Sequence, residues 1–374
     1  MYYHIILTEK CNSRCKYCYQ KSMEEFDNGL KDKFEFDYSA PCESTVKGVD
    51  VARFLKDGDC LIFYGGEPLV NFQKMKEIID SVEKSKKKIK FYIQTNGKLL
   101  NEIPLIYINK MSKMLVSIDG DMRRTDYNRG FGTYNKVLNN LIELREKGYK
   151  GEIVARMTLS FSDVFGQVRH IVGLIEKGIF DSVHWQIDAG FYKSDFNKKQ
   201  FKLFVKEYNR SIDRLLDFWV DYMKENKKVL KFYPFLGIFE CLHYDRKTKL
   251  HCGSGYANYT ILTNGKIVAC PIMSGIKNFY CGDLTSPNET LKEIYVQEPC
   301  SSCEYLDICG GRCLYSNYAQ LWPEEGQKLI CESVIHLIQG VYDVLPKIED
   351  LIEKKIILEY DFDYEKYFGP EIIP

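Results

Sequence analysis

The sequence lacks net charge and lacks any run of apolar residues long enough to cross a membrane. Its 374 residues include 52 basic and 52 acidic side chains, and this balance disfavours a nucleic-acid partner, which would favour a basic stripe. The first residues also lack the pattern of a signal peptide. We therefore expect neither a nucleic acid nor a membrane as a partner.

Cysteine, in contrast, is abundant. Fourteen cysteines occur in a chain without a secretory signal, and this combination favours metal clusters in a reducing compartment over disulfides. We predict a cytoplasmic location. Cys42 and Cys60 belong to an insertion-like region at residues 20–60, and we expect both to be free thiols rather than ligands.

Apolar runs alternate with segments of helical periodicity through the first half of the chain. Repeated strand–helix units predict an α/β fold with a parallel sheet and helices outside it. The expected strands are Tyr3–Leu7, Leu61–Tyr64, Phe91–Thr95, Leu115–Ile118, Ile153–Leu159 and Val183–Ile187. The helical segments between them include Asn71–Lys86, Thr133–Lys147 and Phe165–Lys177.

Three cysteines, Cys11, Cys15 and Cys18, follow the first expected strand with the spacing Cys-x3-Cys-x2-Cys. Three thiolates on one loop can hold three irons of a cubane iron–sulfur cluster. The fourth iron then lacks a protein ligand, and an open metal position is the mark of a catalytic site. A zinc knuckle is the alternative, but zinc sites usually combine two Cys-x2-Cys hooks or add histidine.

The cysteine motif resembles that of the radical S-adenosylmethionine (radical SAM) enzymes. The resemblance implies that Cys11, Cys15 and Cys18 hold the catalytic [4Fe–4S] cluster, whose open iron binds the amino and carboxylate groups of S-adenosylmethionine. Electron transfer from the cluster then yields a 5′-deoxyadenosyl radical, which removes a hydrogen atom from the substrate. The resemblance also implies a partial (β/α)6 TIM-like barrel, and parallel barrels gather their sites at the C-terminal strand ends.

Gly65, Gly66, Glu67 and Pro68 follow the second expected strand. Glycines allow a close approach of the backbone, and a carboxylate can receive an ammonium group. The resemblance implies that this segment binds the methionine amino group of the cofactor. A simple turn from strand to helix is the alternative.

Polar residues also end the next strands. Asn96 lies in Gln94-Thr95-Asn96-Gly97, and Ser117 and Asp119 lie in Ser-Ile-Asp-Gly. The resemblance implies that Ser117 and Asp119 face the ribose and carboxylate of S-adenosylmethionine. Arg156 in the fifth strand, if buried, needs an anion, and this anion is either the cofactor carboxylate or a partner in a structural salt bridge.

Two further positions complete the expected cofactor site. The resemblance implies that Tyr17, inside the cysteine loop, lies next to the adenine. Gln186 and Asp188 end the sixth expected strand, where they face either the adenine or the substrate.

The texture of the chain changes near residue 240. Cysteines become dense, turns multiply and periodicity fades, as expected for a small domain stabilised by metal. The spacing Cys-x12-Gly-x4-Cys, then Cys-x2-Cys-x5-Cys-x3-Cys, then a last cysteine resembles the SPASM domain of peptide-modifying radical SAM enzymes. The seven cysteines are Cys252, Cys270, Cys300, Cys303, Cys309, Cys313 and Cys331.

This second resemblance implies two auxiliary [4Fe–4S] clusters, and therefore three clusters in all. By the family pattern, one auxiliary cluster is held by Cys300, Cys303, Cys309 and Cys331. The other is held by Cys252, Cys270 and Cys313. Its fourth ligand is Cys241, Cys281 or a histidine (His243 or His251), or the iron is open and binds substrate. Paired zinc sites are the alternative for the whole region.

The resulting domain prediction has four parts. Residues 1–195 form the radical SAM barrel, and 196–240 form a helical bridge with an amphipathic stretch at Asn197–Glu225. Residues 241–335 form the SPASM domain. Residues 336–374 hold a tail and most of a final helix, expected at roughly Ser333–Lys354.

Auxiliary clusters suit net two-electron oxidations, because they can carry electrons away from a substrate radical. We predict an oxidoreductase that oxidises or crosslinks a ribosomally made peptide, similar to archaeal peptide-modifying radical SAM enzymes. Its partners are a peptide or protein substrate and an electron donor such as flavodoxin or ferredoxin. Only ten residues precede Cys11, so we expect any leader recognition to come from a separate protein or from the C-terminal region.

Three rival functions can be weighed. Anaerobic sulfatase maturases carry an aspartate after the cysteine that matches Cys270, whereas Pro271 stands here and counts against that function. A cofactor-biosynthesis enzyme remains open. A non-enzymatic zinc-binding module would not need the motifs at residues 65–68 and 117–120.

Overall fold

The computed structural model describes residues 1–18, 30–160, 163–191, 193 and 195–369, so part of the insertion-like region at 20–60 lies outside the described residues. The chain divides into two compact units. Unit 1 comprises Met1–Arg156, Gly178–Phe180 and Gly253–Tyr295. Unit 2 comprises Met157–Lys177, Asp181–Cys252 and Val296–Pro374.

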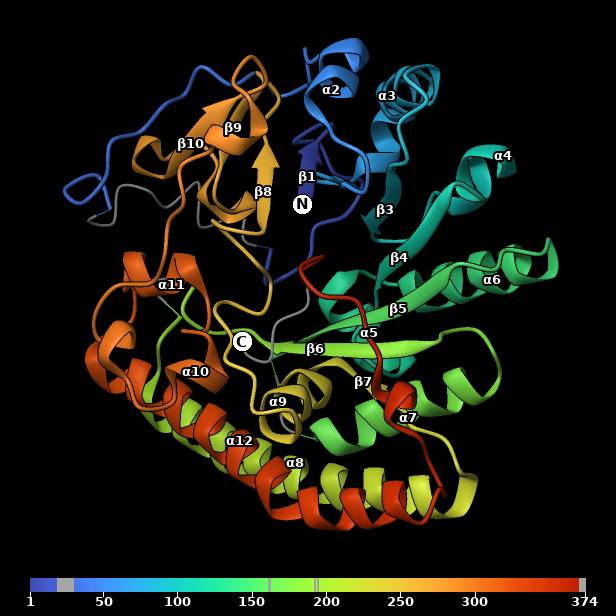
Figure 1. Cartoon of the computed structure of the whole chain (residues 1–374), viewed down its shortest axis with the longest axis vertical. Helices are drawn as coiled ribbons and strands as arrows, with labels where there is room; N and C mark the ends of the chain where they lie inside the picture. The colour runs from blue at the N-terminus through green and yellow to red at the C-terminus, as the bar shows by residue number, and fades with distance from the viewer. Residues whose placement is uncertain (19–29, 161–162, 192, 194, 370–374) are drawn as a thin grey trace. The chain divides into compact units, whose positions relative to one another are not determined.

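Unit 1 is built on a sheet with the strand order β10-β9-β8-β1-β2-β3-β4-β5 (Figure 1). All neighbours from β8 to β5 are parallel, whereas β9 and β10 are antiparallel additions. The strands are β1 (Tyr2–Ile6), β2 (Cys60–Tyr64), β3 (Lys90–Thr95), β4 (Met111–Ser117), β5 (Glu152–Leu159, whose last residues belong to unit 2), β8 (Asn258–Ile261), β9 (Lys266–Val268) and β10 (Tyr280–Asp283).

Continuous apolar runs explain why the central strands form. Every residue of β2 is buried, as is every residue of β1 after Tyr2, which is typical of parallel strands covered on both faces. The strands predicted from the sequence are confirmed. The sequence analysis missed β8, β9 and β10, because they are short and lie where periodicity fades.

The helices of unit 1 connect the parallel strands. Asn71 begins α3, where its side chain accepts from the Lys74 amide at 3.2 Å, and Asp121 caps α5 in the same way at 2.8 Å from the Arg124 amide. The α-helices are α2 (Gly48–Phe54), α3 (Phe72–Lys84), α4 (Leu105–Ile108), α5 (Met122–Arg129) and α6 (Thr133–Glu146). The 3-10 helices are η1 (Pro68–Asn71), η2 (Leu100–Glu102), η3 (Pro271–Met273), η4 (Lys277–Phe279) and η5 (Asn288–Thr290).

Unit 2 contains one parallel strand pair and two long helices, α8 and α12, that lie side by side (Figure 1). Its strands are β6 (Ser182–Ile187) and β7 (Lys231–Phe232). Its α-helices are α7 (Val164–Glu176), α8 (Lys198–Asn226), α9 (Tyr233–His243), α10 (Leu306–Cys309), α11 (Leu314–Ala319) and α12 (Glu324–Glu353). Its 3-10 helices are η6 (Cys300–Ser302) and η7 (Glu359–Phe362).

Helix α12 begins at Glu324, earlier than the predicted start near Ser333. Pro323 precedes the helix, and Glu324 and Glu325 occupy its first turn, where acidic side chains are favourable. The earlier start places Cys331 on this helix. Contrary to the sequence analysis, α12 is long and apolar enough to pass as a membrane span, but half of its most apolar window is buried, as in a core helix.

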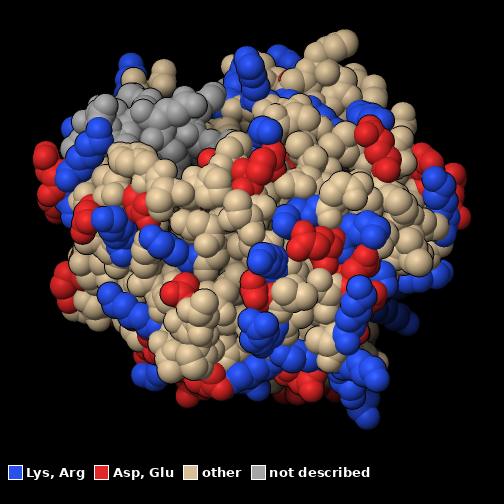
Figure 2. Space-filling view, turned by 90° about the horizontal axis from the view of Figure 1, so that it is seen from above, with Lys and Arg blue, Asp and Glu red and all other residues tan. Residues whose placement is uncertain are grey.

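The division into units follows strand pairing. Because β8 pairs in parallel with β1, residues 253–295 group with the N-terminal strands. The boundaries at residues 195, 240 and 335 stay predictions. Basic and acidic side chains are interspersed over the face seen in Figure 2, in keeping with the zero net charge.

Candidate functional site

The first cysteine motif forms a loop after β1. The Cys18 amide donates to the Cys15 carbonyl at 3.2 Å, and the Glu9 amide donates to the Cys42 carbonyl at 2.8 Å. Cys11 is exposed, whereas Cys15 and Cys18 are half-buried. Within the described residues none of the three forms a disulfide, as ligation of a cluster requires.

Gly65 and Gly66 lie against the backbone that leads into this loop. A Cβ on Gly65 would lie 2.3 Å from the Thr8 carbonyl oxygen, and one on Gly66 would lie 2.4 Å from the Lys10 carbonyl oxygen. The amides of Gly66 and Glu67 donate to the same two carbonyls, each at 2.9 Å. Only glycine fits this close approach, so the two glycines fix the start of the cysteine loop.

Glu67 follows these glycines as a buried carboxyl group, only 1% exposed. Its oxygens accept from the Thr95 hydroxyl at 2.7 Å and from the amides of Asn96 at 2.7 Å and Leu69 at 3.1 Å. Burial raises the pKa of Glu67 to about 7, although these hydrogen bonds oppose the rise. The carboxyl group is therefore buried and oriented by donors at the end of β3 and at the start of η1.

Asn96 connects the end of β3 to the cysteine loop. Its side-chain nitrogen donates to the Asn12 side chain at 2.6 Å and lies 3.9 Å from Cys11 Sγ. Its side-chain oxygen accepts from the Lys98 amide at 3.0 Å. In this structure Asn96 therefore contacts the loop that carries the cysteines.

Asp119 is completely buried, and protein donors occupy its carboxylate. Its Oδ2 accepts from the Tyr17 hydroxyl at 2.5 Å, from Asn128 at 3.2 Å and from Arg129 Nε at 3.0 Å. Its Oδ1 accepts from Arg129 Nη2 at 2.8 Å. This engagement differs from the predicted direct contact of Asp119 with the cofactor, because the carboxylate binds Tyr17 and Arg129.

Tyr17 is held by the same network. Burial and the Asp119 charge keep the pKa of Tyr17 well above its usual range, although Arg129 opposes them, so the hydroxyl remains a donor. The Arg129 guanidinium lies 5.2 Å from the centre of the Tyr17 ring. Helix α5 also contacts Lys16, whose amide donates to the Asn128 carbonyl at 3.0 Å.

The sequence analysis missed Asn128 and Arg129. The only signal was an arginine and an asparagine on a polar helix soon after Ser-Ile-Asp-Gly, and such residues are ordinary on exposed helices. Folding turns them inward, and Arg129 is only 7% exposed. A buried ion pair of this kind was invisible without the tertiary structure.

Ser117 and Arg156 lie opposite each other in the β4–β5 register. Both are partly exposed, so the premise that Arg156 is buried is corrected. Arg156 lies within β5, opposite the last residue of β4. Gln186, in β6 of unit 2, is also partly exposed.

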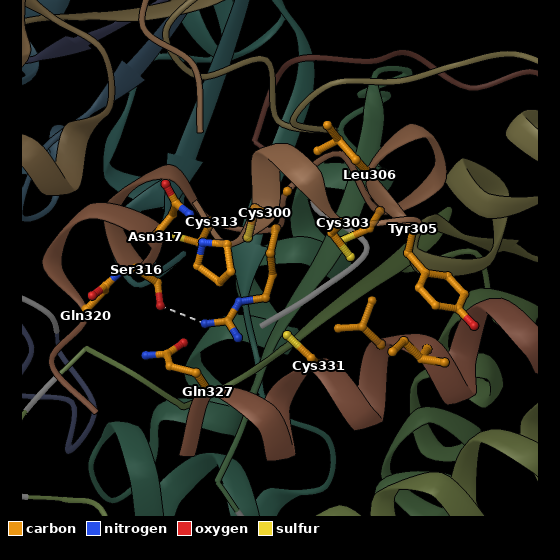
Figure 3. A pocket seen from close by; sticks show the side chains of 16 residues that line it. Cys300, Cys303, Tyr305, Leu306, Cys313, Ser316, Asn317, Gln320, Gln327 and Cys331 are labelled. Carbon is orange, nitrogen blue, oxygen red and sulfur yellow. Dashed lines mark hydrogen bonds between the residues drawn. The ribbon is translucent and has the colours of Figure 1, made fainter. Parts of the chain in front are cut away.

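In unit 2, one cavity gathers the cysteines expected to hold an auxiliary cluster. Figure 3 shows Cys300, Cys303 and Cys331 around this cavity, together with Ser316 and Gln327. Cys300 is the first residue of η6, and Cys331 comes from α12. The cavity is also lined by Cys309, Arg312 and Cys313.

The donors of this cavity fit an iron–sulfur cluster. The Gln327 side-chain nitrogen is buried without a hydrogen-bond partner among the described residues, and cluster sulfurs accept such bonds. Burial raises the pKa of the Cys309 thiol to about 12, so metal ligation must supply the charge that keeps it a thiolate. Within the described ranges no group of three Cys, His, Asp or Glu side chains is placed to hold a single metal ion, and a cubane separates its thiolates more widely.

The other predicted cluster is not tested by this geometry. Cys252 and Cys313 are buried in unit 2, and Cys270 is buried in unit 1. Cys241 is buried in α9, where burial raises its pKa to about 11. Cys281 Sγ lies 3.4 Å from the Phe279 carbonyl oxygen. The identity of the fourth ligand therefore stays undecided between Cys241, Cys281, a histidine and an open iron.

The two candidate histidines have other partners. His243 Nδ1 lies 3.0 Å from Glu349 Oε1, and its ring stacks on Phe239. His251 Nε2 lies 2.8 Å from the Ile308 carbonyl oxygen. Both contacts are those of packed structural histidines.

Comparison with known proteins identifies the class. Residues 5–175 match the model of the Radical SAM superfamily, which includes the cysteine loop and the motifs at residues 65–67, 96 and 117–119. Residues 5–175 therefore form a radical SAM domain, the mark of an enzyme class that uses S-adenosylmethionine and a [4Fe–4S] cluster. The predicted fold class is confirmed.

Individual relatives place the chain within this class. The radical SAM cyclopropyl synthase TigE of Paramaledivibacter caminithermalis is 23% identical over 97% of this chain and 76% of its own length. The structure of native anSMEcpe with bound AdoMet has a TM-score of 0.67 and 18% identity, and the match covers 94% of this chain and 99% of that chain. Streptococcus suis SuiB bound to precursor peptide SuiA has a TM-score of 0.56 and 17% identity over 85% of this chain and 72% of SuiB. The two structures support the fold, including the C-terminal extension.

Proposed function

We propose that this chain is a peptide-modifying radical SAM enzyme that oxidises or crosslinks a ribosomally made peptide. The observation that carries the proposal is the combination of a radical SAM domain with a second, cysteine-lined cavity in unit 2. A cluster in that cavity would accept an electron from the substrate radical. Net oxidation then removes two hydrogen atoms from the substrate.

In this proposal the catalytic cluster is held by Cys11, Cys15 and Cys18. Bound S-adenosylmethionine supplies the radical that removes a hydrogen atom from the substrate. Glu67 receives the cofactor amino group, and its buried position and oriented oxygens support this role. Ser117 and Arg156, partly exposed and adjacent in the sheet, receive the ribose and carboxylate.

We assign a different role to Tyr17 and Asp119. Asp119 and Arg129 position the Tyr17 side chain for contact with the adenine. Asn96 orients the loop through Asn12. Gln186, at the end of β6, faces the adenine or the substrate.

We propose two auxiliary clusters, and hence three [4Fe–4S] clusters in all. Lining of one cavity by Cys300, Cys303, Cys309 and Cys331 supports the first. The second, with Cys252, Cys270 and Cys313, rests on cysteine spacing alone. Its fourth ligand is Cys241 in the simplest arrangement.

A peptide substrate is supported by two kinds of relative. SuiB is seen with its precursor peptide SuiA, and anSMEcpe with Cp18Cys peptide. TigE is a cyclopropyl synthase, and closing such a ring between two carbons removes one hydrogen from each. We propose a cytoplasmic location and an electron donor such as flavodoxin or ferredoxin. Leader recognition, if used, comes from a separate protein or from the C-terminal region. All fourteen cysteines lie in the described residues and none forms a disulfide, which suits a reducing compartment.

Intact mass of a candidate peptide tests the proposal. The chain is co-expressed without oxygen with each short open reading frame beside its gene. We expect the peptide to lose one hydrogen pair, and fragmentation then identifies the residues joined. An unchanged mass while S-adenosylmethionine is still cleaved would direct the search to a sulfatase-like protein or a small molecule. A Cys11→Ala, Cys15→Ala, Cys18→Ala variant serves as the inactive control.

A further inference from the structure

The segment between Cys309 and Cys313 has an unusual backbone. Gly310, Gly311 and Arg312 are consecutive residues with φ of 72°, 84° and 67°. Glycine adopts such angles freely, but an arginine does so at a cost. Strain of this kind persists only where the surroundings enforce it, and it clusters at functional sites.

Gly310 and Gly311 both pack closely against neighbouring segments, so the backbone next to Arg312 has little room to move. A Cβ on Gly310 would lie 2.0 Å from the Lys249 carbonyl oxygen, and one on Gly311 would lie 2.6 Å from a Val296 methyl group. The segment is therefore held between Lys249 and Val296. The strained arginine is held at one place on the wall of the cysteine-lined cavity.

Arg312 is a buried cation without a carboxylate partner. It is only 7% exposed, and its guanidinium Nη2 donates to the Ser316 hydroxyl at 2.6 Å, the bond drawn at Ser316 in Figure 3. In the described part of the chain no Asp or Glu forms an ion pair with it. A buried charge is costly unless an opposite charge compensates it.

Thiolates of the neighbouring cysteines can supply the negative charge that Arg312 lacks. Arg312 lines the same cavity as Cys300, Cys309 and Cys331. Four thiolates around a cubane make a negatively charged group. The unpartnered Gln327 nitrogen adds a second donor on the wall.

We propose that Arg312 sets the reduction potential of the auxiliary cluster held by Cys300, Cys303, Cys309 and Cys331. A cluster that accepts one electron gains one negative charge, and a fixed cation beside it stabilises this reduced state. Net charge and hydrogen bonds to the sulfurs are among the factors that set such potentials. Arg312 therefore makes the cluster a better electron acceptor. The inference rests on the cluster proposed above.

Redox titration followed by electron paramagnetic resonance tests this role. The full chain, with Cys11, Cys15 and Cys18 replaced by alanine, is reconstituted with iron and sulfide and carries Arg312→Gln, Arg312→Lys or no further change. We expect a more negative midpoint potential for R312Q and a midpoint closer to the parent for R312K, at equal iron content. The control is Arg210→Gln, because Arg210 is an exposed arginine on α8 paired with Glu207, and it should leave the midpoint unchanged.

The outcomes separate the two proposals. Equal midpoints for the parent and R312Q, with iron content retained, overturn the role of Arg312 but leave the cluster. A parent protein that takes up no auxiliary cluster overturns both. If R312Q alone loses its iron, the Ser316→Ala variant is measured instead, because it removes the hydrogen bond that holds the Arg312 guanidinium. A more negative midpoint potential of this variant supports the role of Arg312, and an unchanged midpoint potential overturns it.

Discussion

At the scale of single residues, the catalytic loop is fixed by contacts that oppose substitution. Two of these contacts differ in their chemistry. One is the hydrogen bond from Tyr17 to Asp119, and the other is the close approach of Gly66 to the Lys10 backbone. The first uses a buried ion pair as its anchor. The second uses the absence of a side chain.

Replacing Tyr17 with phenylalanine removes one hydrogen bond and keeps the ring. A hydrogen bond to a charged group contributes about 1.5–3 kcal/mol, so we expect the rate of S-adenosylmethionine cleavage to fall about tenfold or more. The iron content should stay unchanged, because Tyr17 is not a ligand. Formation of 5′-deoxyadenosine and bound iron are measured together.

The matched control is Tyr107→Phe. The Tyr107 hydroxyl also bonds an aspartate, Asp80, at 3.0 Å, but this pair lies between α4 and α3. Its removal should leave cofactor cleavage unchanged. An equal loss of activity in both variants would contradict the role given to the Asp119 network.

Gly66→Ala should prevent the cysteine loop from closing. Its methyl group would lie 2.4 Å from the Lys10 carbonyl oxygen, a distance that forces the backbone before Cys11 to move. We expect loss of the catalytic cluster, measured as a drop in iron content and in the signal of the reduced cluster. Gly173→Ala is the control, since Gly173 lies in α7 with open space around it and alanine favours a helix by about 1 kcal/mol.

At the scale of elements, the pairing of β1 with β8 joins distant parts of unit 1. His4 on β1 is buried, and its Nδ1 lies 2.9 Å from Asn258 Oδ1 on β8. Burial lowers the pKa of His4 to about 4. The histidine is therefore neutral in the folded protein at neutral pH.

This shift predicts acid sensitivity. Between pH 6.5 and pH 4 the unfolded chain binds a proton at His4 that the folded protein does not, so the free energy of unfolding falls with falling pH, by about 3 kcal/mol in total. Above pH 6.5 the effect is absent. Thermal unfolding of the wild type and of His4→Gln from pH 7 to pH 5 measures it, and we expect the variant to have the shallower pH dependence. Parallel curves would rule out His4 as the source.

At the scale of the whole molecule, the number of clusters is the main open quantity. Three cubane clusters correspond to about twelve irons per chain. Replacing Cys11, Cys15 and Cys18 with alanine should lower this to about eight and abolish 5′-deoxyadenosine formation. Iron and sulfide analysis after anaerobic reconstitution gives the count. Retained cofactor cleavage in this variant would overturn the site assignment.

Much of unit 1 could be predicted because its signals are local. Apolar runs indicated the strands β1 to β5, and glycines or polar residues directly after a strand indicated the site. The strands β8, β9 and β10 could not be predicted, because segments this short are stabilised by a neighbour rather than by their own periodicity. The early start of α12 at Glu324 was also missed.

The sequence by itself determined the class of chemistry, because cysteine spacing decides which thiols one loop can offer to a cluster. It also determined the α/β fold, since burial on both faces requires continuous apolar strands. Only the tertiary structure decided what Asp119 and Arg312 contact. Asp119 accepts hydrogen bonds from Arg129, and Arg312 lines the cysteine-lined cavity. The partner of a buried charge is set by long-range packing, so the local sequence does not indicate it.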